Sequence, residues 1–470
     1  MFAICAYGGE TLDNSAAGSA TQAYNMFCGV AVMMFVGFGY LMTFMKWHGL
    51  TAVGFTMLVT AMGLQWAVLT ESFFDQWMNN YPDWHYVPVN IYSLLGGLYA
   101  VSSVLITFGG LIGKITPFQL VIIAIIELTL HSLNYKVLIS GPIHVADMGG
   151  TYIDHLFGAY FGLAVAWVLG KPTSEPAMGA VPDIFSLIGT VFLWIYWPSF
   201  VAGAADANSD QQQRAIVYTV LALSSSTITA FFTSSFLNKN AVIRPVDIQN
   251  ATLAGGVSIG CVANLTMNPA VAIFIGIGAS LISTIGYYFV QPFLEEKWNI
   301  HDTCGINNLH GMTAIFGGIV SVIVAAVNKD QDQSIYDGDS GFDYASGQWW
   351  RQLVGLIVVF AYSIFTGILT GYFVLFVAKT PEKNDMFNDN QYWDVADDHG
   401  RSFWSELGLM VNGGKKDDLD GSAHKAESII NDLDTSGHAG RRQAPGPLDV
   451  PASAIIMDDT TSLVDDQSKA

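Results

Sequence analysis

Two aspartate and histidine pairs recur in the sequence with the same local pattern, and their side chains suit the handling of a small polar molecule. Asp147 precedes His155 and Asp302 precedes His310, and both stretches read D-x-x-G-x-x-x-x-H. Each aspartate suits the start of a helix, where its carboxylate accepts bonds from N–H groups and faces the positive end of the helix dipole. At a helical rise of about 1.5 Å per residue, each histidine lies about 12 Å farther along its helix.

Long helices are needed to position these histidines, and the sequence is rich in apolar runs that can form them. Of 470 residues, 51% are hydrophobic and 12% are charged, which is about half the charged fraction of an average soluble protein. We count eleven runs able to span a hydrocarbon core of about 30 Å. The runs cover residues 26–45, 50–70, 89–112, 117–139, 148–169, 183–204, 215–237, 249–266, 269–291, 308–327 and 352–378. The sequence therefore predicts an all-α polytopic membrane protein with eleven transmembrane helices.

The two patterns also predict an internal repeat. His155 lies in the fifth run and His310 opens the tenth, so the copies are 155 residues and five spans apart. An odd number of spans per copy places the halves in opposite orientations, which indicates a five-plus-five inverted repeat with its site near mid-depth. Two histidines that enter from opposite faces meet there. Because ionisable side chains are costly inside apolar spans, this pair is the candidate functional site.

Other residues whose side chains could do chemistry are weaker candidates for a functional site. His131 and His144 lack a matching copy, and we expect them to be structural. Four cysteines are present: Cys5, Cys28, Cys261 and Cys304. Their spacing fits neither a metal site nor a disulfide scaffold, and no further Cys or His cluster supplies the three or four ligands of a zinc site. We expect no metal, no cofactor and no catalytic residue.

Charge indicates how the chain is divided and oriented. A net charge of −20, from 19 Lys+Arg and 39 Asp+Glu, argues against a nucleic-acid partner. Basic residues in odd-numbered connections outnumber those in even-numbered ones by eight to four, which predicts an external N-terminus and a cytoplasmic C-terminus. We expect an extracellular segment over 1–25, a membrane domain over 26–378 and a cytoplasmic tail over 379–470. Residues 71–84 and 329–344 then face outside.

The segment after residue 378 is predicted to be a mostly disordered acidic tail. It holds 9 basic and 18 acidic side chains, a composition typical of unfolded segments. Its first part keeps Phe387, Tyr392, Trp393 and Trp404, which suit docking on the membrane domain, and the acidic remainder suits contact with a cytosolic partner. Asn264-Leu265-Thr266 matches a glycosylation sequon. Because this sequon adjoins the end of the eighth run, we do not expect it to be occupied.

Small residues spaced four apart predict close packing between helices. The pattern G-x-x-x-G occurs at Gly158 and Gly162, at Gly256 and Gly260, and at Gly367 and Gly371. Such pairs let helix backbones approach one another inside a membrane. We expect a compact bundle around a narrow pore.

Five stretches of the sequence resemble the Rh glycoproteins of the ammonium transporter/Rh superfamily. They are Asp147 with HLFGAYFGL (155–163), WIYWPSF (194–200), IQNATLAGGV (248–257), HDTCGINNLHGM (301–312) and FVGFGYLMTF (35–44). They lie in the family's order between about residues 26 and 380. The resemblance implies the ammonium-transporter fold and a homotrimer in membrane lipid. Each subunit of such a trimer has its own hydrophobic pore for ammonia.

The same resemblance implies a role for individual residues. His155 and His310 match the family's paired pore histidines. Asp147 matches the aspartate near the external mouth, and Asp302 its counterpart in the second repeat. Phe200 matches one of two stacked gate phenylalanines. The other gate position falls on Tyr99, whose hydroxyl offers a hydrogen bond to an entering ammonium ion.

These observations predict a membrane channel for ammonium and not an enzyme. A bare ammonium ion at mid-bilayer is costly to desolvate, whereas neutral ammonia is not. We therefore expect ammonium to lose its proton near Tyr99 and Phe200, and ammonia to pass two neutral, hydrogen-bonded histidines. Methylammonium is a further expected substrate, and the plasma membrane or another cellular membrane is the expected location. Two alternatives remain open: a carbon dioxide channel through the same pore, and a non-conducting sensor or scaffold that signals through its tail.

Overall fold

Long apolar helices make up almost all of the described structure. The computed structural model describes residues 5–7, 17–78, 86–138, 141–327, 347–382 and 385–394, all within one compact unit. In these ranges ten helical segments are long and apolar enough to cross a membrane. They are Gln22–Phe44, Gly49–Met78, Ile91–Leu111, Pro117–Leu138, Thr151–Leu169, Ala180–Ala202, Asp210–Leu237, Pro269–Trp298, Asn307–Val327 and Gln348–Val377. The predicted helical membrane protein is confirmed.

Several of these spans are built from more than one kind of helix. The α-helices are α1 (Ala17–Val32), α2 (Gly39–Leu41), α3 (Gly49–Met78), α4 (Ile91–Leu111), α5 (Pro117–Leu138), α6 (Phe157–Leu169), α7 (Ala180–Ala202), α8 (Asp210–Leu237), α9 (Pro245–Ala251), α10 (Ala254–Ile259), α11 (Pro269–Ile285), α12 (Gln291–Trp298), α13 (Met312–Val327) and α14 (Gln348–Val377). Wider π-helical turns are η3 (Met33–Phe38), η5 (Thr151–Leu156), η6 (Gly286–Val290) and η7 (Asn307–Gly311). Tighter 3-10 turns are η4 (Met42–Phe44) and η10 (Asp389–Gln391). Two short parallel strands, β1 (Cys5–Tyr7) and β2 (Val87–Val89), pair with each other.

The predicted eighth span, 249–266, is the one that the structure does not build as a continuous long helix. It contains the end of α9, the six-residue helix α10 and a series of turns. Every residue of α10 is buried in protein, where an interrupted backbone can find partners that lipid does not offer. The Thr151 hydroxyl supplies two of them, because it donates to Val257 O and accepts from the Cys261 N–H. Hydropathy indicated burial here correctly but not the break in the helix.

The second span is longer than predicted, because α3 continues to Met78. Glu71 and Asp75, which we placed in an external connection, lie on the last turns of this helix. Asp75 forms a 2.8 Å ion pair with Lys136 on α5. Polar partners on the neighbouring helix therefore let α3 extend past the apolar run. Most of the predicted external segments, 79–85 and 328–346, lie outside the described residues.

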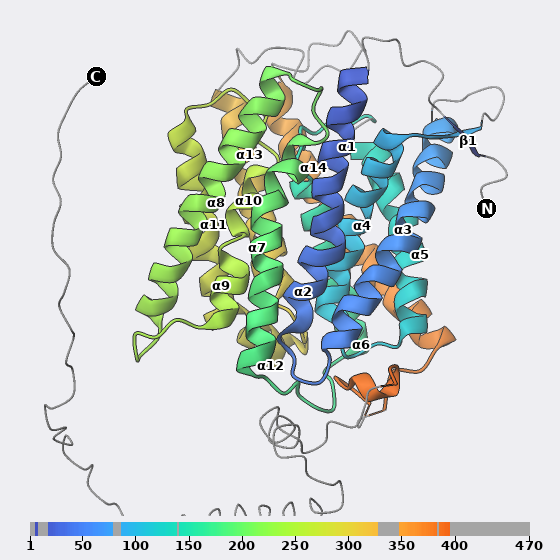
Figure 1. The fold of residues 1–470 in the computed structure, drawn as a ribbon, viewed down its shortest axis with the longest axis vertical. Coiled ribbons are helices and arrows are strands. Elements are labelled where there is room, and N and C mark those ends of the chain that lie inside the picture. Colours follow the sequence, from blue (N-terminus) through green and yellow to red (C-terminus); the bar gives the residue numbers. More distant parts are fainter. Residues whose placement is uncertain are drawn as a thin grey trace, which may run out of the picture. The chain divides into compact units, whose positions relative to one another are not determined.

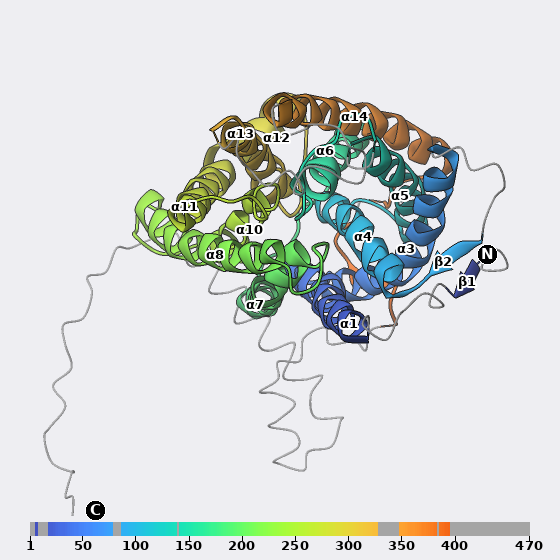
Figure 2. The same ribbon diagram turned by 90° about the horizontal axis from the view of Figure 1, so that it is seen from above.

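The span that carries His155 and the neighbouring helix α4 form the centre of the bundle (Figures 1 and 2). In an 18-residue apolar window of the Ile91–Leu111 span 83% is buried in protein, and in one of the Thr151–Leu169 span 78%, more than in any other described span. Helix α6 packs between α4 and α14. A Cβ atom at Gly158 would lie 2.6 Å from Ser103 O, and one at Gly367 would lie 2.5 Å from Phe161 O. The close helix packing predicted from the G-x-x-x-G patterns is therefore present at these positions, since glycine alone permits such approaches.

The beginning of the predicted tail docks on the membrane unit. The Asp389 carboxylate accepts bonds from the N–H groups of Leu50 and Thr51, at 2.8 and 2.9 Å, and so caps the N-terminus of α3. The Trp393 indole donates to the Thr51 hydroxyl at 3.0 Å, and Phe387 is buried. The aromatic residues that we expected to dock thus make contacts as far as the structure describes them. Trp404 and the rest of the tail, 395–470, lie outside the described residues.

Asp389→Ala is expected to release this docked segment. The change removes two charge-assisted bonds at a helix N-terminus, worth about 1–2 kcal/mol for a good cap. Hydrogen exchange followed by mass spectrometry should show faster exchange at the amides of Leu50 and Thr51. The matched control is Asp394→Ala, which removes the same charge from an exposed position. Equal protection of both amides in the two variants would contradict the capping role.

Candidate functional site

His155 and His310 lie side by side in the interior of the bundle. Their Nδ1 atoms are 3.1 Å apart, and the ring planes differ by 17° with centroids 5.2 Å apart. Both residues are buried, with 2% and 3% of their surface exposed. At this distance one Nδ1 donates its hydrogen to the other, so neutral rings must adopt complementary tautomers. The structure therefore brings together the two histidines that the repeated pattern singled out.

The D-x-x-G part of each pattern builds the helix start that carries its histidine. Gly150 and Gly305 adopt left-handed backbone conformations, with φ of 67° and 74°. Side chains other than glycine rarely adopt this region. There is also no room for one, since a Cβ atom at Gly150 would lie 2.0 Å from Asp154 Oδ2. Each glycine thus turns the chain into the π-helical turn, η5 or η7, that holds a histidine.

The two aspartates of the pattern are used differently. Both carboxylate oxygens of Asp302 accept hydrogen bonds from backbone N–H groups. Oδ1 accepts from Gly305 and Ile306, and Oδ2 accepts from Asn307, at 2.9 to 3.0 Å. In Asp147 only Oδ2 accepts such bonds, from the backbone N–H groups of Tyr152 and Ile153. Its Oδ1 has no hydrogen-bond partner among the described residues. Asp302 therefore acts as an anchor for its helix, whereas Asp147 also offers a free oxygen.

Asp147 is one of the residues that line a vestibule of about 900 Å³. The vestibule has an acidic and aromatic lining. Its acids are Glu71, Asp147, Asp154 and Asp206, its tyrosines are Tyr92, Tyr99 and Tyr135, and its basic side chains are His131, Lys136 and His144. Lys136 is already paired with Asp75. A lining of this kind attracts cations through carboxylates and ring faces.

Tyr99 and Phe200 separate the vestibule from the two histidines. Their ring centroids are 4.9 Å apart at an interplanar angle of 85°, so the rings meet edge to face. The resemblance implied stacked rings, and the structure has this perpendicular arrangement, which aromatic pairs also favour. The Tyr99 hydroxyl is buried without a partner among the described residues. Phe200 lies beyond it, with its ring centroid 5.8 Å from that of His155.

Apolar side chains line the path on the far side of the histidines. Phe38 stacks on His310 with centroids 6.2 Å apart. Next to it is a small cavity of about 20 Å³, lined by Phe38, Leu41, Met42, Leu105, Ile106, Gly109, Asn250, Cys304, Gly305, Ile306, Leu309 and His310. This volume suits a single molecule of the size of water. The cavity lining offers few polar groups besides His310 and Asn250.

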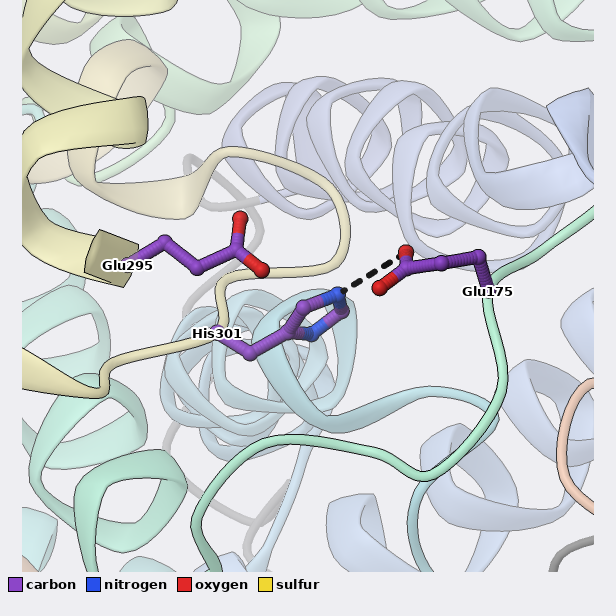
Figure 3. A group of neighbouring side chains, drawn as sticks. All are labelled: Glu175, Glu295 and His301. Atoms are coloured by element: carbon purple, nitrogen blue, oxygen red, sulfur yellow. Dashed lines mark ion pairs between the residues drawn. The ribbon is translucent and has the colours of Figure 1, made fainter.

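One group of side chains elsewhere has the composition of a metal site, and Figure 3 shows it. His301 Nε2 lies 3.8 Å from a Glu175 oxygen, and Glu295 completes the group. Burial lowers the pKa of His301 to about 3, with Lys114 and Lys171 acting in the same direction. The ring is therefore neutral at pH 7. Since Lys171 already pairs with Glu295 at 3.8 Å, we assign no metal to this group.

Comparison with known proteins decides the family. A sequence model described as the Ammonium Transporter Family matches residues 5–392. The chain belongs to this family. Ammonium transporter Rh type C of Homo sapiens is 38% identical over 391 residues, which cover 80% of this chain and 80% of that protein. The Rh type C protein of Xenopus tropicalis is 36% identical over 389 residues, covering 80% and 82%.

Solved structures agree with this family assignment. Nitrosomonas europaea Rh50, of the Rhesus protein family of channels, matches with a TM-score of 0.70 and 28% identity, covering 90% of this chain and 99% of Rh50. A sensor Amt protein shares the fold, with a TM-score of 0.65 at 18% identity and coverage of 82% and 100%. The resemblance to Rh glycoproteins and the ammonium-transporter fold are confirmed. The relatives of this ammonium transporter family member are channels and transporters, not enzymes.

The structure of this family member also adds residues that sequence reasoning missed. Asp154 lies in η5 directly before His155, and its Oδ1 is 2.8 Å from His131 Nε2 on α5. We had expected His131 to be structural and had overlooked Asp154. One signal was available, because an aspartate inside the predicted span 148–169 is itself a functional candidate. The partnership with His131 was not readable, since 23 residues and a connection separate the two.

Proposed function

We propose that this chain is an ammonium channel that conducts neutral ammonia. The route runs from the vestibule past Tyr99 and Phe200, along His155 and His310, and out through the small apolar cavity. The contact between the two imidazoles supports this proposal most, because it places two hydrogen-bonding rings side by side on a mostly apolar path. A neutral imidazole pair can both donate to ammonia and accept from it.

Ion desolvation explains why ammonia, and not ammonium, is the conducted species. Moving an ammonium-sized ion out of water costs many kcal/mol unless charged partners replace the lost water. No carboxylate lies among the residues that line the small cavity. Ammonia is neutral and needs only one or two hydrogen bonds to replace its hydration. The apolar lining therefore selects the neutral molecule.

The vestibule supplies the charge that the rest of the path lacks. Its acidic side chains raise the local concentration of cations, and the faces of Tyr99 and Phe200 attract ammonium. The free Asp147 oxygen and the unpartnered Tyr99 hydroxyl accept bonds from it. Ammonium gives up its proton before the aromatic pair, ammonia crosses, and water on the other side reprotonates it.

Assembly and orientation complete the proposal. We place residues 1–25 outside the cell and residues 379–470 in the cytoplasm, so the vestibule opens outward. A homotrimer fits the large apolar side chains that the outer helices expose, among them Phe232, Phe236 and Phe376. Such side chains need lipid or a neighbouring subunit to cover them. Each subunit then carries its own pore.

Flux through purified protein in liposomes tests this function. Ammonia and methylamine entry is followed from the internal pH, with membrane current recorded in parallel. We expect entry well above that of protein-free liposomes, with no current. One charge moved for each ammonia would refute neutral conduction.

The same preparation separates the other functions considered. Carbon dioxide permeability is measured in the same liposomes, because a small apolar gas needs only the hydrophobic lining. Carbon dioxide entry above ammonia entry would replace the proposed substrate. Entry of neither molecule would favour a sensor or scaffold that acts through its tail.

A further inference from the structure

A buried acid and base pair lines the vestibule separately from the repeated motif. Asp154 Oδ1 and His131 Nε2 are 2.8 Å apart, and their side chains are only 3% and 2% exposed. Both residues are among those that line the vestibule. His131 Nδ1 has no hydrogen-bond partner among the described residues. The pair is thus buried in protein but borders the space that ammonium enters.

Local structure does not require this pair. The backbone of η5 is already held by Gly150, whose carbonyl accepts from the N–H groups of Asp154 and His155 at 3.0 Å each. The Asp147 carboxylate binds the preceding amides. A buried acid and base in contact add little net stability, because the loss of hydration offsets their attraction. Charge placed inside a membrane span without a structural need points to function.

The position of Asp154 connects the vestibule with the gate. Asp154 lines the vestibule together with Tyr99, Asp147 and Glu71. In the chain it is followed by His155. A cation that enters the vestibule therefore has Asp154 and the gate residue Tyr99 in the lining of the same space.

We propose that Asp154 and His131 together bind ammonium in the vestibule and accept the proton that it releases before ammonia passes Tyr99 and Phe200. This inference rests on the proposed function and names the acceptor of its first step. In the proton-accepting state that the proposal requires, Asp154 is a carboxylate and His131 is a neutral imidazole, so the pair carries one negative charge and attracts a cation.

The proton transfer balances within the pair. One N–H bond of ammonium breaks and leaves its electron pair on nitrogen, which gives ammonia. One O–H bond on Asp154 or one N–H bond on His131 forms, and the pair becomes neutral overall. The loss of charge removes the attraction for a further cation and frees the ammonia. The pair regains its charge when the proton returns to water in the vestibule.

Asp154→Asn tests the pair with the smallest change of shape. Asparagine keeps a hydrogen bond to His131 but removes the charge and most of the ability to accept a proton. We expect the ammonium concentration for half-maximal flux in liposomes to rise about tenfold or more, as is typical for loss of one charge-assisted hydrogen bond. The matched control is Glu127→Gln, which replaces a buried carboxyl on α5 that does not line the vestibule by an amide of the same shape. It should leave the half-maximal concentration unchanged.

A second readout separates this inference from the proposed function. Infrared difference spectra of the protein in lipid are recorded on addition of ammonium chloride, with sodium chloride as the reference. We expect a change in carboxyl or imidazole bands in the wild type that is lost in Asp154→Asn and in His131→Gln. His131→Gln also gives the flux comparison if Asp154→Asn does not insert into the membrane.

Each outcome decides one of the two proposals. A conducting wild type, with Asp154→Asn unchanged in half-maximal concentration and in spectrum, overturns the role of the pair and leaves the channel intact. A wild type that conducts no ammonia overturns the channel. In that case the ammonium-specific spectral change alone decides whether the pair binds the ion.

Discussion

Replacement of both His155 and His310 by alanine is expected to lower ammonia flux by about ten- to a hundredfold. In the proposed channel, ammonia that leaves the vestibule exchanges hydrogen bonds with water for hydrogen bonds with the two rings. A net hydrogen bond contributes about 0.5–1.5 kcal/mol, and each 1.4 kcal/mol in a barrier changes a rate about tenfold. Without the rings, ammonia has no side-chain hydrogen-bond partner between the aromatic pair and the small apolar cavity, so its barrier to passage rises. Flux in liposomes, normalised to the amount of inserted protein, measures the loss.

The single variants serve as controls for this double change. His155→Ala and His310→Ala each keep one ring, which still donates and accepts, so each should lose less flux than the double variant. Membrane current should stay at zero unless water fills the enlarged space and carries ions. Wild-type flux in the double variant would show that ammonia does not travel along the imidazoles.

Asp302→Ala is expected to have the largest effect on stability. The carboxylate is buried and accepts three backbone N–H bonds at the start of η7. Its removal leaves three buried donors without partners, and losses of this kind cost about 3–5 kcal/mol in favourable cases. The thermal midpoint in detergent should fall strongly. Hydrogen exchange should rise at the amides of Gly305, Ile306 and Asn307.

Asp302→Asn and Asp147→Ala provide the comparison. Asparagine can still accept with its one oxygen, but its amide faces the N–H of Asn307, so Asp302→Asn should lose part of the stability. Asp147→Ala removes two backbone bonds and the carboxylate of a vestibule residue, so it should lower the apparent affinity for ammonium as well as the stability. An Asp302→Ala protein as stable as the wild type would refute the anchoring role.

The repeated pattern predicted much of the candidate site because the interactions that give each residue its role are formed within the same short segment. Aspartate at a helix start, glycine in a left-handed turn and histidine farther along the helix each follow from backbone chemistry within nine residues. The long apolar runs were equally readable, since their length is set by membrane thickness. The aromatic residues at the start of the tail stood out against a polar background. The inverted symmetry of the two halves and the pore role of the histidines stay predictions.

Features that depend on distant neighbours were missed or wrongly assigned. The eighth span is broken because the Thr151 hydroxyl, far away in sequence, satisfies its backbone. Helix α3 extends past its apolar run because Lys136 on another helix pairs with Asp75. The edge-to-face contact of Tyr99 with Phe200 depends on how α4 and α7 pack. No pattern within a single segment contains this information.

The sequence by itself determined a membrane-spanning helical chain with two matching histidines, because hydropathy and helix-start chemistry act over short stretches of chain. Tertiary structure alone decided what lies around those histidines: a free oxygen on Asp147 but none on Asp302, and a bonded Asp154 and His131 on the vestibule wall. The physical reason is that burial and hydrogen-bond partnership are properties of packed helices. Whether a charged side chain is an anchor or a binding group depends on which of its atoms the rest of the fold leaves unpaired.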